Sequence, residues 1–379
     1  MTDIECAVNL LKLSVTQQRY SVPAPADMEW LWNFAALQMI GATIAEPLLS
    51  SGIPMDEDMR LRWRERLYKN KRKTMMYDVE RKNIYRALEK HGIWHAPLKG
   101  IVVGKLYPSY GTREFADNDI LIDSSMLDEV ERAMADLDYE FDTTSIVIHY
   151  TFHKPPVFNF ELHHKLLVEK PGYDAVLRYF NQITSRLITD ENNVYCRSMT
   201  AEDSYLYIIA HAYRHYLHSG TGVRILSDVY VYKKSVQMDE HYLKQALEEM
   251  ELSGFASFLE DLSESIFGRE GVFRLSDLTE EQQSFLNSFI ESGAYGTAEN
   301  YMTRKLGEMK TKSGRTSKLK YYKARLFPPI EPYRKKYPTL YKHKALHPIF
   351  YIYRPIKGVF RDGKRIAGEI SFISRAKKK

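Results

Sequence analysis

The chain has 379 residues, of which 44% are hydrophobic and 27% charged, so it is long enough for two or three domains and has the composition of a folded protein. It contains only two cysteines, which excludes a disulfide framework and a zinc ribbon. Its first residues lack the basic and apolar regions of a signal peptide, and no apolar run is long enough to cross a membrane. We therefore expect a cytoplasmic protein.

The net charge of +5 hides a strong asymmetry along the chain. Residues 304–379 hold 23 Lys and Arg against 4 Asp and Glu, whereas residues 1–303 hold 31 against 45. Aromatic side chains lie among the basic residues, for example in the segment Phe350-Tyr-Ile-Tyr353. Such a tail suits an anionic partner, either RNA or a membrane surface, and the latter would place the protein at the membrane periphery. A solvated extension is the alternative interpretation.

Helices are expected in the N-terminal part of the chain. Apolar residues recur at helical spacing over residues 3–18 and 26–49, and a charged helix is expected from Asp56 to about His91. We expect these helices to pack against a catalytic sheet.

A glycine turn follows the N-terminal helices. An apolar stretch ends at Leu98, Lys99-Gly100 come next, and a helix is expected over residues 101–106. Glycine lets a backbone come close to a ligand, and free N–H groups at the start of a helix attract phosphate. The pattern therefore predicts a cradle for a triphosphate.

The next expected strand begins with Asp117-Asn118-Asp119 and continues as an apolar run to Asp123. Because side chains alternate along a strand, Asp117 and Asp119 share one face, about 6.6 Å apart. Two carboxylates this close repel each other unless they share a cation, and oxygen ligands select a hard ion such as Mg²⁺. The pair predicts half of a metal site.

A helix and two strands are expected next, over residues 126–137, 145–152 and 157–162. Ser124-Ser125 is the expected helix cap, and Lys154-Pro-Pro is expected to turn between the strands. In the second strand Glu161 and His163 fall on the polar face, opposite Phe160. A site of this kind needs a third carboxylate from a later strand, and Glu161 is the candidate.

From Ala201 onward the sequence is helical, with helices expected over residues 201–217, 224–234, 239–267 and 279–295. In the first of them His211 and His215 lie four residues apart, a spacing that can bind zinc. No glutamate base accompanies them, so structural histidines are the alternative.

Several of these segments together resemble a bacterial family of uncharacterised nucleotidyltransferases, in the superfamily that includes DNA polymerase β. The segments are Leu98-Lys99-Gly100, Tyr107-Pro108, Arg113, Asp117-x-Asp119 and Glu161-Leu-His163. The resemblance implies an α+β fold with a small mixed-sheet nucleotidyltransferase core over residues 85–172. An N-terminal helical region would span residues 1–84, a helical domain residues 173–300, and a basic aromatic extension residues 301–379.

Two positions depart from the pattern of the superfamily. Lys99-Gly100 stands where Gly-Ser is usual, which makes Lys99 a candidate phosphate contact. Asn118 stands where an apolar residue is usual, so it needs a polar partner on the covered face of the sheet.

The resemblance also implies a reaction, in which NMP moves from an NTP such as ATP to an unidentified acceptor and pyrophosphate is released. Asp117, Asp119 and Glu161 would bind Mg²⁺ or Mn²⁺ and carry the catalysis, and Lys99, Gly100 and Arg113 would bind the nucleotide. Weaker site candidates are His163, His211, Arg224 and Asp228. The rival hypothesis is a non-catalytic nucleotide-binding or regulatory protein on the same fold.

Ion pairs are the alternative interpretation of three of these residues. Arg113 could pair with Asp117 or another nearby acid, and Arg224 could pair with Asp228 on a helix surface, since these two are four residues apart.

Overall fold

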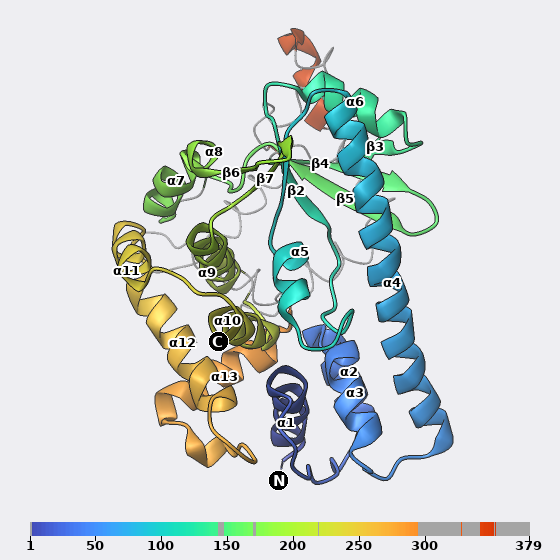
Figure 1. The fold of residues 1–379 in the computed structure, drawn as a ribbon, viewed down its shortest axis with the longest axis vertical. Helices are drawn as coiled ribbons and strands as arrows, with labels where there is room; N and C mark the ends of the chain where they lie inside the picture. The colour runs from blue at the N-terminus through green and yellow to red at the C-terminus, as the bar shows by residue number, and fades with distance from the viewer. Residues whose placement is uncertain are drawn as a thin grey trace.

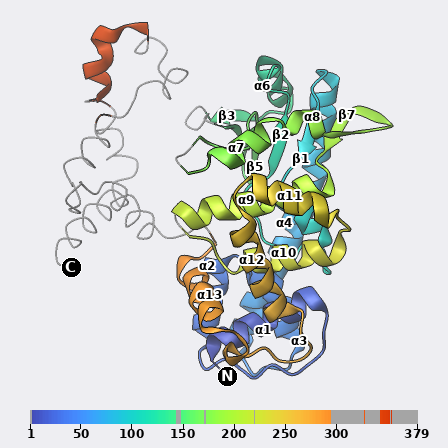
Figure 2. The same cartoon turned by 90° about the vertical axis from the view of Figure 1, so that its left-hand side faces the viewer.

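The structure is a computed structural model that describes residues 2–142, 148–169, 172–218 and 220–294, together with 327, 342–351 and 353. Its α+β architecture places a mixed sheet at one end of the molecule and helices α1, α3 and α13 at the other (Figures 1 and 2). The fold class predicted from the sequence is confirmed.

The strands of the described chain form one seven-stranded sheet in the order β3-β4-β5-β2-β1-β7-β6. Their bounds are β1 (His95–Pro97), β2 (Asp119–Ile122), β3 (Glu140–Asp142), β4 (His149–Lys154), β5 (Phe158–His163), β6 (Ile188–Asp190) and β7 (Asn193–Ser198). The central strand β2 runs antiparallel to β1 and parallel to β5.

Helices cover both faces of this sheet and fill the opposite end of the molecule (Figure 1). They are α1 (Asp3–Thr16), α2 (Met28–Gln38), α3 (Gly41–Ser50), α4 (Glu57–Lys90), α5 (Gly100–Val103), α6 (Leu127–Ala135), α7 (Asp174–Asn181), α8 (Ile183–Arg186), α9 (Ala201–His218), α10 (Arg224–Ser235), α11 (Glu240–Glu249), α12 (Ser253–Phe267) and α13 (Glu280–Ser292). Short 3₁₀ turns are η1 (Gly104–Leu106), η2 (Leu275–Asp277) and η4 (Lys344–Leu346).

Alternation along β2 divides the core into two parts. Ile120 and Ile122 face α4 and α6 and belong to one apolar cluster, which also contains Phe160 of β5. Leu121 faces the other way and belongs to a larger cluster shared with α1, α9, α10 and α12, where Tyr207 is buried. Asp119, two residues before Leu121, is therefore on the α9 side of the sheet.

Helix α4 runs along one side of the molecule and reaches from the N-terminal helices to the sheet (Figure 1). Its side chains hold the loop that leads into β2. Asn70 donates to the carbonyl oxygen of Gly111 at 2.7 Å, and Lys73 donates to that of Phe115 at 2.7 Å. One turn before these, Arg66 pairs with Glu114 at 2.9 Å. The acidic segment therefore enters the sheet at a position that α4 sets.

The polar partner expected for Asn118 also comes from α4. Arg81 donates from Nη2 to Asn118 Oδ1 at 2.7 Å, and both residues are buried. An amide on the covered face of the sheet is thus satisfied, as its burial requires.

Most predicted elements are present with shifted ends. The expected helix over residues 26–49 is two helices, α2 and α3, separated at Met39, whose φ is 52°. The expected strand over 145–152 is β4, although residues 143–147 lie outside the described chain. The prediction that Ser124-Ser125 caps α6 is wrong. The helix begins only at Leu127, and the residue at its cap position, Met126, makes no side-chain hydrogen bond to it.

Strands β3, β6 and β7 are not predicted from the sequence. Strand β7 pairs in parallel with β1 at His95 and Cys196 and carries β6 on its outer edge. The sheet therefore extends past residue 172, although helices make up most of the segment that follows. The proposed domain boundaries stay predictions.

Within the described part of the chain, no helix is long and apolar enough to cross a membrane. Nearly all of the basic tail predicted to bind an anionic partner, residues 304–379, lies outside the described residues.

Candidate active site

A cleft of about 300 Å³ opens between the sheet and helices α9 and α10. Every residue proposed from the sequence as a site residue lines it, except His163. Those that do are Lys99, Gly100, Arg113, Asp117, Asp119, Glu161, His211, Arg224 and Asp228. His149, Arg214 and Thr221 line the cleft as well and were not proposed, and so does His215, whose spacing from His211 suggested zinc. Residues far apart in sequence thus meet at one place.

Two of the three acidic candidates reach the cleft from neighbouring strands, and the third from the loop before one of them. Asp119 is the first residue of β2 and lies in register with Glu161 of the parallel strand β5. The N–H of Glu161 donates to the carbonyl oxygen of Asn118 at 2.9 Å, which fixes the two strand ends side by side. Asp117 lies two residues before β2 begins, in the preceding loop rather than in the strand.

Asp119 is the most tightly held of the three carboxylates. Its Oδ1 accepts hydrogen bonds from Lys99 Nζ at 2.8 Å and from His163 Nε2 at 2.7 Å. Burial alone would raise the pKa of Asp119, but the charge of Lys99 and the hydrogen bond from His163 hold it well below its usual range. Asp119 is therefore a fixed carboxylate anion.

Asp117 has a different environment. Among the described residues it has no hydrogen-bond or ion-pair partner, although it is half-buried. Burial, with added repulsion from Glu161 and Asp119, raises the pKa of Asp117 to about 6. Negative charge at this point of the cleft thus exceeds what the neighbouring cations of the described residues, Lys99 and Lys73, balance.

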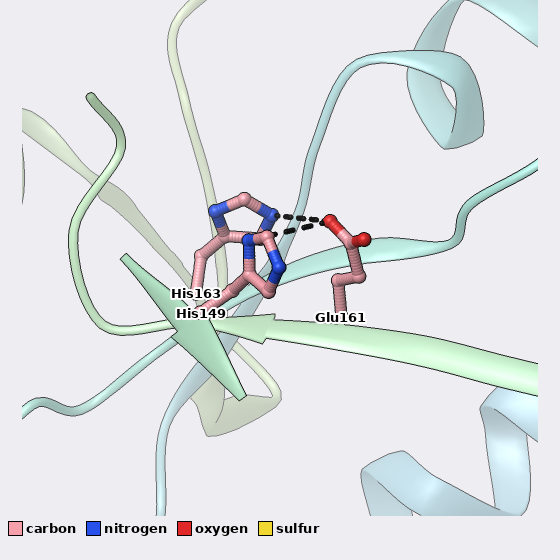
Figure 3. Close-up of side chains that lie close together, drawn as sticks. All are labelled: His149, Glu161 and His163. Atoms are coloured by element: carbon pink, nitrogen blue, oxygen red, sulfur yellow. Dashed lines mark ion pairs between the residues drawn. The ribbon is translucent and has the colours of Figure 1, made fainter. Parts of the chain in front are cut away.

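Glu161 faces two histidines (Figure 3). Its Oε2 lies 3.4 Å from His149 Nδ1 and 3.6 Å from His163 Nε2. One ligand atom from each of the three residues falls within 4.8 Å of the others, close enough to share a metal ion. Burial and the neighbouring His163 lower the pKa of His149 to about 4, so His149 is a neutral imidazole near pH 7. The side-chain alternation of β4 could have placed His149 beside Glu161.

The donors gathered here fit a hard divalent cation. Asp117, Asp119 and Glu161 line one cleft, and the first of them is half-buried without a partner among the described residues. Such an excess of buried negative charge is stabilised by a bound cation, and oxygen donors favour Mg²⁺ or Mn²⁺. Lys99 supplies part of the compensating charge.

The turn at Lys99-Gly100 differs from the expected phosphate cradle in two respects. Helix α5 has only four residues, so it offers a single turn of N–H groups. A Cβ on Gly100 would lie 2.8 Å from Arg113 Nη1, so the missing side chain makes room for that arginine. Lys99 has φ of 44°, a strained backbone for a residue with a side chain, and its ammonium reaches Asp119.

Arg113 forms a closed ion pair with a residue distant in sequence. Its Nε and Nη2 each donate to one oxygen of Asp228, both at 2.7 Å, and both side chains are nearly buried. Tyr107 donates its hydroxyl to the same carboxylate at 2.8 Å. Burial would raise the pKa of Asp228, but Arg113 lowers it below its usual value.

The interpretation of Arg224 and Asp228 as a surface ion pair is therefore wrong, because Asp228 is buried and bound to Arg113. Arg224 instead donates to the carbonyl oxygen of Glu114 at 2.8 Å and so ties the start of α10 to the loop before β2.

The α9 wall of the cleft carries His211, Arg214 and His215. Arg214 Nη2 lies 3.1 Å from His211 Nε2 and 3.4 Å from His215 Nε2. A guanidinium beside both ring nitrogens occupies the place that a zinc ion would need. The pair is therefore not a zinc site in this arrangement.

Comparison with known proteins agrees with this geometry. The family model described as an uncharacterised nucleotidyltransferase matches residues 24–268, which include every carboxylate and cation of the cleft named above. No curated protein and no solved structure gives a significant match. With well over half of its length covered by that family model, the chain belongs to the uncharacterised nucleotidyltransferase family.

Proposed function

We propose that the protein is a Mg²⁺-dependent nucleotidyltransferase, which moves NMP from an NTP to an acceptor and releases pyrophosphate. The observation that carries this proposal is the meeting of Asp117, Asp119 and Glu161 in one cleft, with Asp119 and Glu161 in register on parallel strands. Family membership supports the same reaction class.

Asp117, Asp119 and Glu161 are the residues that would hold the metal. When bound, such an ion balances the charge of the triphosphate and makes an attacking hydroxyl more acidic. Lys99 and His163 act through Asp119, because their two hydrogen bonds fix the direction in which its second oxygen points. They are positioning residues for that carboxylate.

The reaction joins an acceptor oxygen to the α-phosphorus of the NTP and breaks the bond from that phosphorus to the oxygen of the leaving pyrophosphate. The acceptor hydroxyl loses its proton in this step. Glu161 is the proposed recipient, because it lines the cleft and the uncharged imidazole of His149 next to it leaves its acceptor oxygens available.

The direct test is to incubate the protein with each of the four α-labelled NTPs, Mg²⁺ and a cell extract, and to follow both pyrophosphate release and the label. We expect one NTP to give metal-dependent pyrophosphate and a labelled acceptor. Binding of NTP with no pyrophosphate from any of the four would favour the rival, a nucleotide-binding or regulatory protein on the same fold.

The basic tail carries a separate proposal, that residues 304–379 bind an anionic partner. The support is the charge of this segment, which holds 23 Lys and Arg against 4 Asp and Glu. Deleting residues 331–379 should weaken RNA binding measured by gel shift at low salt, because fewer phosphates are then neutralised and fewer counterions released. Vesicle sedimentation with anionic lipid distinguishes a membrane partner. Unchanged behaviour in both assays would leave the tail a solvated extension.

A further inference from the structure

Besides its carboxylates, the cleft carries several cationic side chains. Four Lys or Arg side chains of the described chain line it, namely Lys99, Arg113, Arg214 and Arg224. A nucleoside triphosphate carries several negative charges, so a cation here that no carboxylate neutralises is suited to bind it.

Three of the four are already engaged. Lys99 is bound to Asp119, and Arg113 is bound through two hydrogen bonds to Asp228. Arg224 is turned toward the carbonyl oxygen of Glu114. Lys99 and Arg113 are thus paired with carboxylates, whereas Arg224 donates to a neutral carbonyl oxygen that directs it toward the loop before β2 without cancelling its charge.

Arg214 differs from these three. Among the described residues it meets no carboxylate or carbonyl oxygen, and its hydrogen-bonding neighbours are the two imidazoles of His211 and His215. Burial, together with the nearby charge of Lys99, holds the pKa of His211 well below its usual value, so this ring is neutral. A neutral Nε2 accepts a hydrogen bond from the guanidinium without cancelling its charge.

Two imidazoles on one helical turn also fix the direction of the guanidinium. His211 and His215 lie four residues apart on α9, with their Nε2 atoms 3.3 Å from each other. Arg214 Nη2 lies beside both, which leaves the other donors of the planar guanidinium to a ligand. A guanidinium held in this way is suited to bidentate recognition of phosphate oxygens.

We infer that Arg214, oriented by His211 and His215, binds the polyphosphate of the nucleotide from the α9 wall. This inference rests on the proposed function for the identity of the ligand, whereas the anion site itself rests on the geometry. In this inference, the main cation that binds the triphosphate comes from α9 and not from the turn at Lys99-Gly100.

The test measures binding without turnover. Dissociation constants for MgATP and for inorganic tripolyphosphate are determined by calorimetry on the full chain, on Arg214→Ala and on Arg214→Lys. Exposed Arg178 on α7, outside the cleft, supplies the matched control Arg178→Ala with the same change of net charge. Urea unfolding of each variant establishes that it is folded.

Arg214→Ala should weaken the binding of both ligands by about 10- to 100-fold, the range for a hydrogen bond to a charged group. Arg214→Lys should recover part of this affinity, because lysine restores the charge but not the paired donors. Arg178→Ala should bind as the wild type does.

Two results would overturn the inference, namely equal binding by folded Arg214→Ala and wild type, or no binding of tripolyphosphate by the wild type. A third result separates the two proposals. If the wild type binds tripolyphosphate through Arg214 but releases no pyrophosphate from any NTP, the anion site stands and the transferase proposal fails.

Discussion

The two walls of the cleft balance their charges in opposite ways. The sheet wall holds Asp117, Asp119 and Glu161 against one ammonium group, that of Lys99, and so retains negative charge. On the helical wall, Asp228 is paired with Arg113, whereas Arg214 and Arg224 donate to uncharged groups and keep their positive charge. The comparison teaches that the net charge which a cleft wall offers to a ligand depends on how its residues are paired within the protein, and not only on how many charged residues it holds.

This difference can be tested, because it predicts that Asp119 is needed for activity and that Asp228 is needed for the stability of the fold. Asp119 and Asp228 are both nearly buried and both paired with a cation. We expect substitution of the first to remove activity and substitution of the second to unfold the protein more easily.

The largest effect is expected for Asp119→Asn. Turnover should fall by about 10³-fold or more, because several kcal/mol of metal-dependent stabilisation depend on this carboxylate and each 1.36 kcal/mol is tenfold in rate. Asparagine keeps an oxygen for the hydrogen bond from Lys99, so the near-ultraviolet circular dichroism should stay that of the wild type. Asp123→Asn, at the far end of the same strand and outside the cleft, is the matched control. Wild-type turnover by Asp119→Asn would require the metal proposal to be dropped.

Next in size is Asp228→Asn, which leaves the guanidinium of Arg113 buried without its charged partner. The free energy of unfolding should fall by about 3–5 kcal/mol in urea titrations. The double variant Arg113→Met/Asp228→Leu should recover most of this stability, because it removes the unpaired charge as well. If Asp228→Asn is as stable as the wild type, the pair is not the structural element that distinguishes the helical wall.

The smallest of these effects is expected for Glu161→Gln. Loss of a proton acceptor typically lowers a rate by about 10² or more, so turnover should remain measurable at roughly one hundredth of the wild-type value. Exposed Glu140 on β3 supplies the control Glu140→Gln. A Glu161→Gln enzyme with full activity would remove this residue from the catalytic set and leave Asp117 and Asp119 as the acidic pair.

The acidic wall could largely be predicted from the sequence, because strand alternation is a local property. The period of two in β5 places Glu161 opposite Phe160, and the same period in β2 separates Asp119 from the buried Ile120. The amide of Asn118 was correctly expected to need a partner. What alternation could not give was the start of β2 after Asp117, since strand ends depend on pairing with neighbours.

The helical wall could not be predicted, because its charges are assigned by contacts between distant segments. Arg113 and Asp228 are 115 residues apart, and nothing near either one in sequence indicates the other. Arg214 stands out only because the structure shows that the other cations are engaged. Strand β7 was missed for a similar reason, since it joins the sheet where Cys196 pairs with the distant His95 of β1.

Helix α4 fixes the loop that leads into β2 at three points along its length. Asn70 donates to Gly111, Lys73 to Phe115 and Arg81 to Asn118, so the order of the donors along α4 follows the order of the acceptors along the loop. Inserting or deleting one residue between Asn70 and Arg81 would rotate the later side chain by about 100° relative to the earlier one. We therefore expect the loop before β2 to tolerate substitutions in this interval better than a change in its length. A change in the bend of α4 over this interval would move Asp117 relative to Asp119, although this part of α4 contacts neither carboxylate.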